Sequence, residues 1–270
     1  MTFPGLALNM AIYFSALIFF AGMVFRMAGW LAVPNPLKIP TTPAPVTTGG
    51  TVFRMLGEVF LFRSLWKADK LLWAAGYIFH LSFLLIIIRH LRYFLYPLPQ
   101  WFFWFSDMGV YAGFALAAAL LYLLSRRLFI DRVAYISNAA DYFYLLLLLL
   151  ISITGLLMKY IFRTNLIDIK DFMLHAAALD PVSMPLGINI FFLVHVFMVL
   201  LLAALFPFSK LMHAAGLFIT PTRAMVNNAR RSRHVNPWAD KEWDSMLSKA
   251  GDTETYMPWS PEQWKERWKK

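Results

Sequence analysis

The sequence contains no cysteine among its 270 residues. A chain without thiols cannot form disulfides, bind zinc through thiolates or hold an iron–sulfur cluster on cysteine ligands. These three kinds of site are therefore excluded within this chain.

Charged residues are also scarce. Only 15% of the chain is charged, whereas 60% is hydrophobic and 17% aromatic. Soluble domains usually have about a quarter of their residues charged, so this composition is typical of a membrane protein. The net charge of +10 comes from basic residues between apolar runs and in the tail. That distribution fits membrane topology and argues against nucleic-acid binding.

Five apolar stretches are long enough to cross a hydrocarbon core of about 30 Å as helices. They cover residues of about 8–31, 71–96, 108–124, 139–161 and 188–214. We therefore predict an all-α integral membrane protein, with five transmembrane helices forming a bundle within residues 1–220.

Basic residues predict the direction of these helices. The first basic residue, Arg26, lies at the far end of the first apolar run. Most of the remaining Lys and Arg residues lie in the first loop (33–70), in the third loop (SRRLFIDR) and in the tail (221–270). By the positive-inside rule, we expect the N-terminus outside and the C-terminus in the cytoplasm. The expected location is the cell's inner, cytoplasmic membrane.

Two segments outside the predicted spans have their own patterns. In the first loop, VFRMLGEVFLFRSLWKADK combines helical apolar spacing with interspersed charge, which is typical of a helix at the membrane surface. The polar tail contains five tryptophans between Trp238 and Trp268. Tryptophan is enriched at protein interfaces, so we expect the tail to dock a partner; an interfacial membrane role is the alternative.

Histidine is concentrated in two of the five stretches. His80 and His90 lie in the second, and His195 and His213 lie in the fifth. Ionisable residues within membrane spans are rare and usually face a functional interior. One such histidine would more often bond two helices together. Two pairs on two helices favour a shared function.

The expected helix directions supply a pairing. The second and fifth spans run in opposite directions, so antiparallel packing brings His90 near His195 on the outer side and His80 near His213 on the inner side. Each pair has the ligand set of a bis-histidine b-type haem. Zinc is disfavoured, because His80 and His90 are about 15 Å apart along a helix and carboxylates are scarce.

These four histidines, ten and eighteen residues apart in the expected spans, resemble the nitrate reductase gamma-subunit (NarI-like) family of dihaem cytochromes b. The resemblance covers about residues 1–220. It implies two haem b groups bound by the four histidines and electron exchange with a quinone.

Within that family, LIIIRHLRYFLYPLP and KIPTTPAPVTTGGTVFRML look most similar to DsrM, the membrane cytochrome of the sulfite reductase-associated DsrMKJOP complex. This resemblance implies menaquinone chemistry, a cytoplasmic iron–sulfur partner similar to DsrK, further membrane and periplasmic subunits, and a role in dissimilatory sulfur metabolism. The heterodisulfide reductase subunit HdrE is an alternative. The nitrate reductase subunit fits less well, because the segment FSDMGVY lacks the quinone-site lysine of that type.

A quinone needs an apolar slot with a polar group for its carbonyl. Arg89 and Arg92 flank His90, and His175 lies in the loop expected to cover it, so these three are candidate quinone residues. For Arg92, pairing with a haem propionate or snorkelling to the interface is the stronger alternative, and Arg89 has the same option.

The sequence shows no catalytic nucleophile, P-loop or dinucleotide motif. We therefore interpret the chain as an electron-transfer subunit of a quinone-linked oxidoreductase complex. A haem-free membrane anchor or transporter that relays protons through histidine is the alternative.

Overall fold

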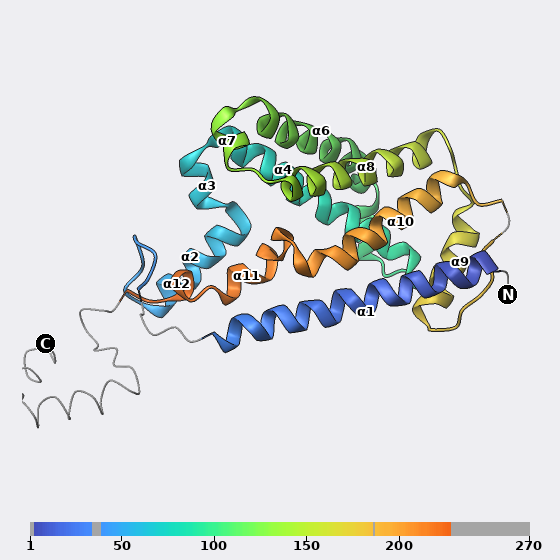
Figure 1. The fold of residues 1–270 in the computed structure, drawn as a ribbon, viewed down its shortest axis with the longest axis horizontal. Helices are drawn as coiled ribbons and strands as arrows, with labels where there is room; N and C mark the ends of the chain where they lie inside the picture. Colours follow the sequence, from blue (N-terminus) through green and yellow to red (C-terminus); the bar gives the residue numbers. More distant parts are fainter. Residues whose placement is uncertain (1–2, 34–38, 186, 228–270) are drawn as a thin grey trace, which may run out of the picture. The chain divides into compact units, whose positions relative to one another are not determined.

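The computed structural model describes residues 3–33, 39–185 and 187–227 (Figure 1). Within these residues the regular structure is entirely helical, which confirms the all-α class. The tail tryptophans predicted to dock a partner lie outside the described residues.

The helices are α1 (Phe3–Ala32), α2 (Thr48–Leu61), α3 (Arg63–Ala68), α4 (Lys70–His90), α5 (Trp101–Ser106), α6 (Met108–Phe129), α7 (Asp131–Tyr135), α8 (Ala139–Tyr160), α9 (Leu166–Ala177), α10 (Ile190–Leu205), α11 (His213–Ile219) and α12 (Pro221–Ala224), with 3-10 turns η1 (Leu91–Tyr93), η2 (Phe206–Phe208) and η3 (Lys210–Met212).

Five helical segments are long and apolar enough to cross a membrane. They are Phe3–Ala32, Lys70–Tyr93, Trp101–Phe129, Ala139–Tyr160 and Ile190–Phe208, and each overlaps one of the five predicted stretches. On α1, the side chains of Phe14, Leu17 and Phe20 are 66%, 64% and 66% exposed. A surface this apolar is unfavourable in water and suits lipid, which has no hydrophobic penalty for it.

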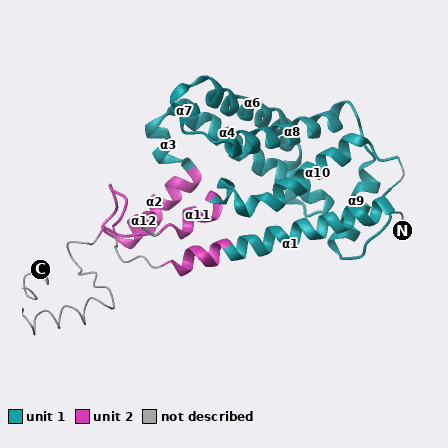
Figure 2. Ribbon diagram, in the orientation of Figure 1, with its two compact units in different colours: residues 1–25, 61–212 teal, residues 26–60, 213–270 magenta. Residues whose placement is uncertain are grey.

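The described chain divides into two compact units, each described by itself (Figure 2). Unit 1 comprises residues 1–25 and 61–212, and unit 2 comprises residues 26–60 and 213–270. In unit 1, α4 packs against α6, α6 against α8, and α8 against α10. Leu116 and Leu120 of α6 form a buried cluster of this core with Leu148 and Leu149 of α8.

Three of the spans begin at side chains that cap the free backbone N–H groups. Asp69 accepts from the N–H groups of the first turn of α4, and Asn189 does the same for α10. At α8, Asn138 and Asp141 form a reciprocal capping box. A capping side chain is worth about 1 kcal/mol, so these polar residues fix where each apolar run becomes helical.

The fifth predicted stretch is not one continuous α-helix. α10 ends at Leu205, and 3-10 turns follow before α11 begins at His213. Pro207 lies in the first of these turns, where its missing N–H prevents an α-helical bond. A Cβ on Gly22 would lie 2.8 Å from Pro207 Cβ, so only glycine permits this close approach of α1. The eighteen-residue spacing from His195 to His213 therefore does not correspond to a single helical face.

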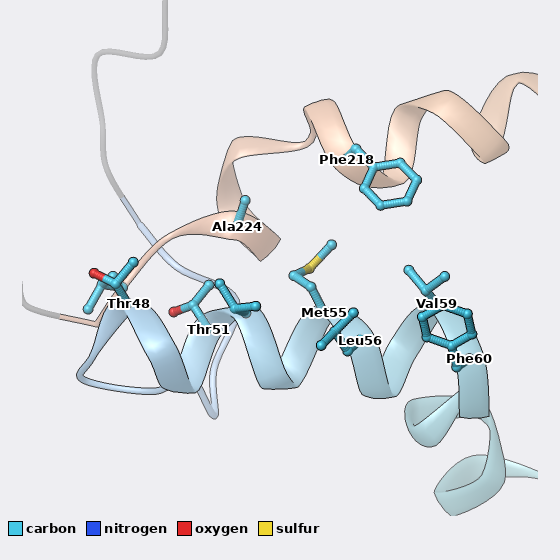
Figure 3. A pocket seen from close by; sticks show the side chains of 10 residues that line it. Thr48, Thr51, Met55, Leu56, Val59, Phe60, Phe218 and Ala224 are labelled. Atoms are coloured by element: carbon cyan, nitrogen blue, oxygen red, sulfur yellow. The ribbon is translucent and has the colours of Figure 1, made fainter.

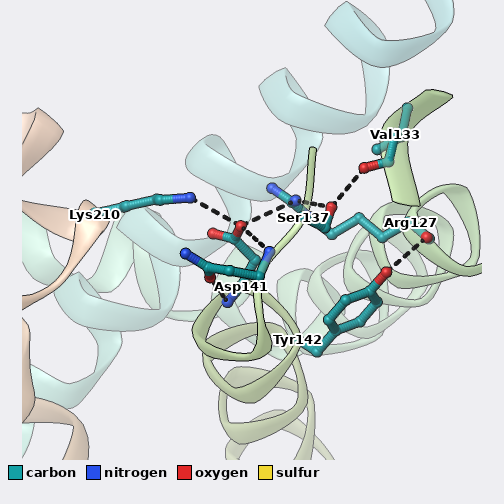
Figure 4. Close-up of polar contacts among 7 residues, drawn as sticks. Arg127, Val133, Ser137, Asp141, Tyr142 and Lys210 are labelled. Atoms are coloured by element: carbon teal, nitrogen blue, oxygen red, sulfur yellow. Dashed lines mark hydrogen bonds and ion pairs between the residues drawn. The ribbon is translucent and has the colours of Figure 1, made fainter. Parts of the chain in front are cut away.

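Ion pairs join the helix ends on one side of unit 1. Asp69 at the start of α4 lies 3.7 Å from Arg126 at the end of α6. Asp141, which is buried at the start of α8, lies 2.8 Å from Lys210 Nζ and 3.6 Å from Arg127 Nη1 (Figure 4). One carboxylate thus joins α8 to α6 and to the segment after α10.

Unit 2 contains an apolar groove of about 480 Å³ between α2 and α11–α12. Figure 3 shows Met55, Leu56 and Val59 of α2 on one side, with Phe218 of α11 and Ala224 of α12 on the other. The segment expected to form one helix at the membrane surface is divided: α2 ends at Leu61, α3 covers Arg63–Ala68 and Lys70 begins α4.

Candidate functional site

His90 at the end of α4 and His195 in the second turn of α10 lie close together in unit 1. Their ring centroids are 6.4 Å apart and their planes are inclined by only 12°. The structure therefore brings together one of the two predicted histidine pairs, from residues 105 positions apart in the sequence.

The separation of these rings fits two ligands of one metal. Two imidazoles that bind a metal from opposite sides, each through a nitrogen at about 2.0–2.1 Å, have ring centres about 6.3 Å apart. No group of three His, Cys, Asp or Glu side chains able to hold a metal occurs in the described ranges. A metal held by this pair would thus need further ligands of its own, and a porphyrin supplies four nitrogens in one plane.

Helix geometry selects the tautomer of two of the rings in their neutral form. His90 Nδ1 lies 2.7 Å from the carbonyl oxygen of Ile86, and His80 Nδ1 lies 2.7 Å from that of Gly76. A carbonyl can only accept, so each Nδ1 must carry the proton and donate. The neutral ring then presents an unprotonated Nε2, which is the form that binds metals.

His195 is oriented by α8, through the Thr154 side chain and the backbone carbonyl of Ile151. Its Nδ1 lies 2.9 Å from Thr154 Oγ1 on α8. The same hydroxyl lies 2.8 Å from the carbonyl of Leu150 and 3.0 Å from that of Ile151. When the single hydroxyl proton is directed to one of these carbonyls, the Thr154 oxygen accepts from His195 Nδ1–H. His195 thus has the same tautomer as His90, with Nε2 available.

Gly155 provides the space for the His195 ring. A Cβ at this position would lie 3.4 Å from His195 Cε1, in contact with the ring. Neither Thr154 nor Gly155 is among the residues that the sequence patterns single out. The signal that could have found them is the break in LLLLLLISITGLL, where small and hydroxyl residues interrupt a leucine-rich span.

The other predicted pair is divided between the two units. His80 lies on α4 in unit 1, with edge contacts to the rings of Phe62 and Phe79 at 5.0 and 4.9 Å. His213 is the first residue of α11 in unit 2. Their pairing stays a prediction.

The three candidate quinone residues have different surroundings. The Arg89 guanidinium donates to the backbone carbonyl and the hydroxyl of Ser106, and so holds the end of α4 against α5. The Arg92 guanidinium lies 5.8 Å from the centre of the Tyr93 ring. His175 is on α9, where its Nδ1 lies 3.0 Å from a carboxylate oxygen of Asp180.

The loop expected to cover His90 does pack there. α9 contacts η1, the turn that directly follows His90. Lys170 of α9 also lies 4.9 Å from the centre of the Tyr96 ring, just beyond that turn. The end of α4 that bears His90 is therefore covered by the helix that carries His175.

Comparison with known proteins gives consistent matches. The family model of the nitrate reductase gamma subunit matches residues 45–230, a range that includes all four histidines. The Hdr-like menaquinol oxidoreductase cytochrome b-like subunit of Archaeoglobus fulgidus is 37% identical over 269 residues, covering 84% of this chain and 81% of the relative. The subunit of the same name from Archaeoglobus profundus is 33% identical over 285 residues, covering 89% and 85%.

A likeness to DsrM is consistent with these matches. Together with the five apolar helices, they place this chain in the nitrate reductase gamma-subunit family of membrane proteins.

Proposed function

We propose that this chain is a dihaem cytochrome b that carries electrons between menaquinol and an iron–sulfur subunit on the cytoplasmic side. The observation that carries the proposal is the His90–His195 pair, with a 6.4 Å ring separation and a defined tautomer on each ring. The names of the two relatives, menaquinol oxidoreductase cytochrome b-like subunits, support the quinone chemistry.

The proposed ligands of the outer haem are His90 and His195, and those of the inner haem are His80 and His213. Bound haem supplies reversible one-electron chemistry. The protein holds the ligands. Backbone carbonyls orient His80 and His90, and Thr154 orients His195. The apolar side chains of the spans keep water away, and a low-dielectric surrounding strengthens these hydrogen bonds.

We place the quinol site on the outer side, near the His90–His195 pair. Arg92 and His175 are its candidate polar residues, and Arg89 is a third. The position of α9 against η1 supports this choice. Two carboxylates flank the His175 imidazole, with Asp180 3.0 Å from Nδ1 and Asp171 3.8 Å from Nε2.

The proposed partner is a DsrK-like iron–sulfur protein in dissimilatory sulfur metabolism, within a complex that has further membrane and periplasmic subunits. The HdrE-type complex is the alternative. The expected location is the inner membrane, with the N-terminus outside. The side of unit 1 that bears Arg126, Arg127 and Lys210 would then face the cytoplasm, as the positive-inside rule requires.

Spectroscopy of four single variants in membranes tests this function. His90→Ala and His195→Ala should each abolish the same haem signal, and His80→Ala and His213→Ala should each abolish the other. Removing one histidine would weaken the binding of the haem that it would hold and leave the other haem bound. The measurements are redox difference spectra and low-temperature electron paramagnetic resonance of each variant. If His80→Ala and His90→Ala removed one common signal, the pairing would be wrong. A wild-type protein without a Soret band would instead favour the haem-free anchor or transporter.

A further inference from the structure

Two polar atoms on α1 are buried and have no hydrogen-bond partner. They are Asn9 Oδ1 and Tyr13 Oη, one helical turn apart. Asn9 is completely buried, with 0% of its surface exposed. Buried polar groups are paired in the great majority of cases, and each exception calls for an explanation, such as a bound molecule. Inside a membrane span the cost is greater, because no bulk water can replace the missing partner.

The orientation of the Asn9 amide is determined by its other contacts. Its Nδ2 donates to the carbonyl of Gly5 at 2.8 Å and to that of Val182 at 3.0 Å. Rotating the amide by 180° would set its oxygen against two carbonyl oxygens, so the rotated form is excluded. Oδ1 is therefore the atom left over, and it can only accept a hydrogen bond.

A neighbouring buried residue of α1 has a hydrogen-bond partner. Ser15 Oγ donates to the carbonyl of Leu200 on α10 at 2.7 Å. The missing partners are thus confined to the two positions nearer the start of the helix, rather than being a property of the whole helix.

The hydrogen-bonding capacity of Asn9 Oδ1 and Tyr13 Oη indicates which chemical group would bind there. A group that donates to Asn9 Oδ1 needs an O–H or N–H, and the Tyr13 hydroxyl can donate to or accept from that same group. A hydroxyl does both at once. A quinol carries a hydroxyl on an apolar ring and reaches proteins through the bilayer. Water is the other molecule with this chemistry.

The direction of the helices places these atoms toward the end of α10 that carries His195. α1 and α10 run in the same direction, since Ser15 meets Leu200 and, further along, Phe19 meets Phe206 with ring centroids 5.5 Å apart. Asn9 lies six residues before Ser15 and contacts the carbonyl of Val182, in the segment that precedes α10. Asn9 is thus toward the same end of unit 1 as the second turn of α10, which carries His195.

This part of α1 borders the lipid. The neighbouring side chains Leu6 and Met10 are 43% and 47% exposed. Tyr13 is half-buried, so its hydroxyl lies inside while part of its ring reaches the surface of the helix.

We propose that Asn9 and Tyr13 bind a hydroxyl group of the quinol beside the outer haem. This inference rests on the proposed quinol oxidation and assigns its binding contacts to α1, in addition to the outer residues Arg92 and His175.

Tyr13→Phe is the decisive variant, because it removes an oxygen that no protein group uses. We expect unchanged thermal stability and unchanged dithionite-reduced haem spectra. The Kd for a fluorescent hydroxyquinoline quinol analogue, measured by quenching in membranes, should rise about fivefold to tenfold, the effect of one hydrogen bond. The KM for a short-chain menaquinol in haem reduction should rise similarly. Asn9→Leu should weaken binding further. Ser15→Ala is the matched control, since it removes a satisfied hydroxyl from the same helix and should leave Kd unchanged.

The outcomes separate the two hypotheses. If Tyr13→Phe and Asn9→Leu keep the wild-type Kd within twofold while the wild type is reduced by menaquinol, the two atoms bind water and this inference is overturned. It is equally overturned if only the Arg92 and His175 variants lose the analogue. If the wild type binds no analogue and accepts no electrons from menaquinol, the proposed function itself fails, and this assignment with it.

Discussion

If the chain binds two haems as proposed, Thr154→Val should alter the signal of one haem and leave that of the other unchanged. The substitution replaces the hydroxyl that accepts from His195 Nδ1 by a methyl group of similar size and keeps the β-branched shape. The helix loses little, because the two carbonyls that Thr154 contacts already accept helical bonds. The change therefore isolates the orientation of one histidine.

The size of the effect follows from the lost hydrogen bond. Such a bond is worth about 0.5–1.5 kcal/mol net. It makes His195 more basic, and a more basic ligand favours ferric iron. Without the bond, the reduction potential of the outer haem should rise. If the whole bond energy distinguished the two oxidation states, the rise would be about 20–65 mV, so about 65 mV is the upper limit for a one-electron couple.

Potentiometric titration of the two haems in membranes provides the assay. Thr154→Ser keeps the hydroxyl and should retain the wild-type potential. Ser152→Ala removes a hydroxyl from the same helix, where it bonds to the Gly113 carbonyl at 3.3 Å, and should shift neither haem. An equal shift of both haems, or no shift in Thr154→Val, would refute the role of this hydroxyl.

Three further predictions concern the rest of the chain. Asp141→Asn keeps an acceptor for the capping box but removes the charge that faces Lys210, so the haem absorbance should be lost at a lower temperature. Because Asp141 is buried and Lys210 exposed, we expect a loss of stability of about 1–2 kcal/mol, between the values for exposed and buried ion pairs. Unchanged thermal loss would contradict this. Truncation after Asn227 should release the iron–sulfur partner while both haem spectra persist, and a partner that remains bound would point to the first loop. Gly155→Ala adds a methyl group 3.4 Å from His195 Cε1 and should preserve the outer haem, whereas Gly155→Leu should displace the ring and eliminate that haem signal; a normal spectrum in Gly155→Leu would disprove the contact.

Much of the fold could be predicted, because transmembrane helices leave a strong record in sequence. The number of apolar helices follows from their length and hydropathy alone. The helix ends are harder to predict. α5 precedes α6 and extends the third apolar segment back to Trp101. Its tryptophans, Trp101 and Trp104, are also typical of a membrane interface, so the sequence does not show that the helical segment begins there. The sequence indicates only a loop where α9 lies, because the charges at Asp168, Lys170 and Asp171 mask the apolar face formed around Phe172.

The candidate site could be predicted in part. Helix direction alone leads to the pairing of His90 with His195, since antiparallel neighbours bring opposite ends together. Thr154 cannot be found in this way, because its role depends on which side of α8 faces α10. Asn9 and Tyr13 pose the same difficulty: a polar residue in a span is visible in sequence, but whether its atoms are satisfied depends on contacts as remote as Val182.

The hydrogen-bond acceptors that select the histidine tautomers differ in how far they depend on sequence. For His80 and His90 the acceptor is the backbone carbonyl four residues earlier. Every residue has a carbonyl, so mutation of Gly76 or Ile86 to another helix-compatible residue leaves that acceptor in place. His195 instead depends on the identity of a second side chain, the hydroxyl of Thr154. A mutational scan should therefore find one sensitive position each for His80 and His90, namely the histidine itself. For His195 it should find two, the histidine on α10 and Thr154 on α8.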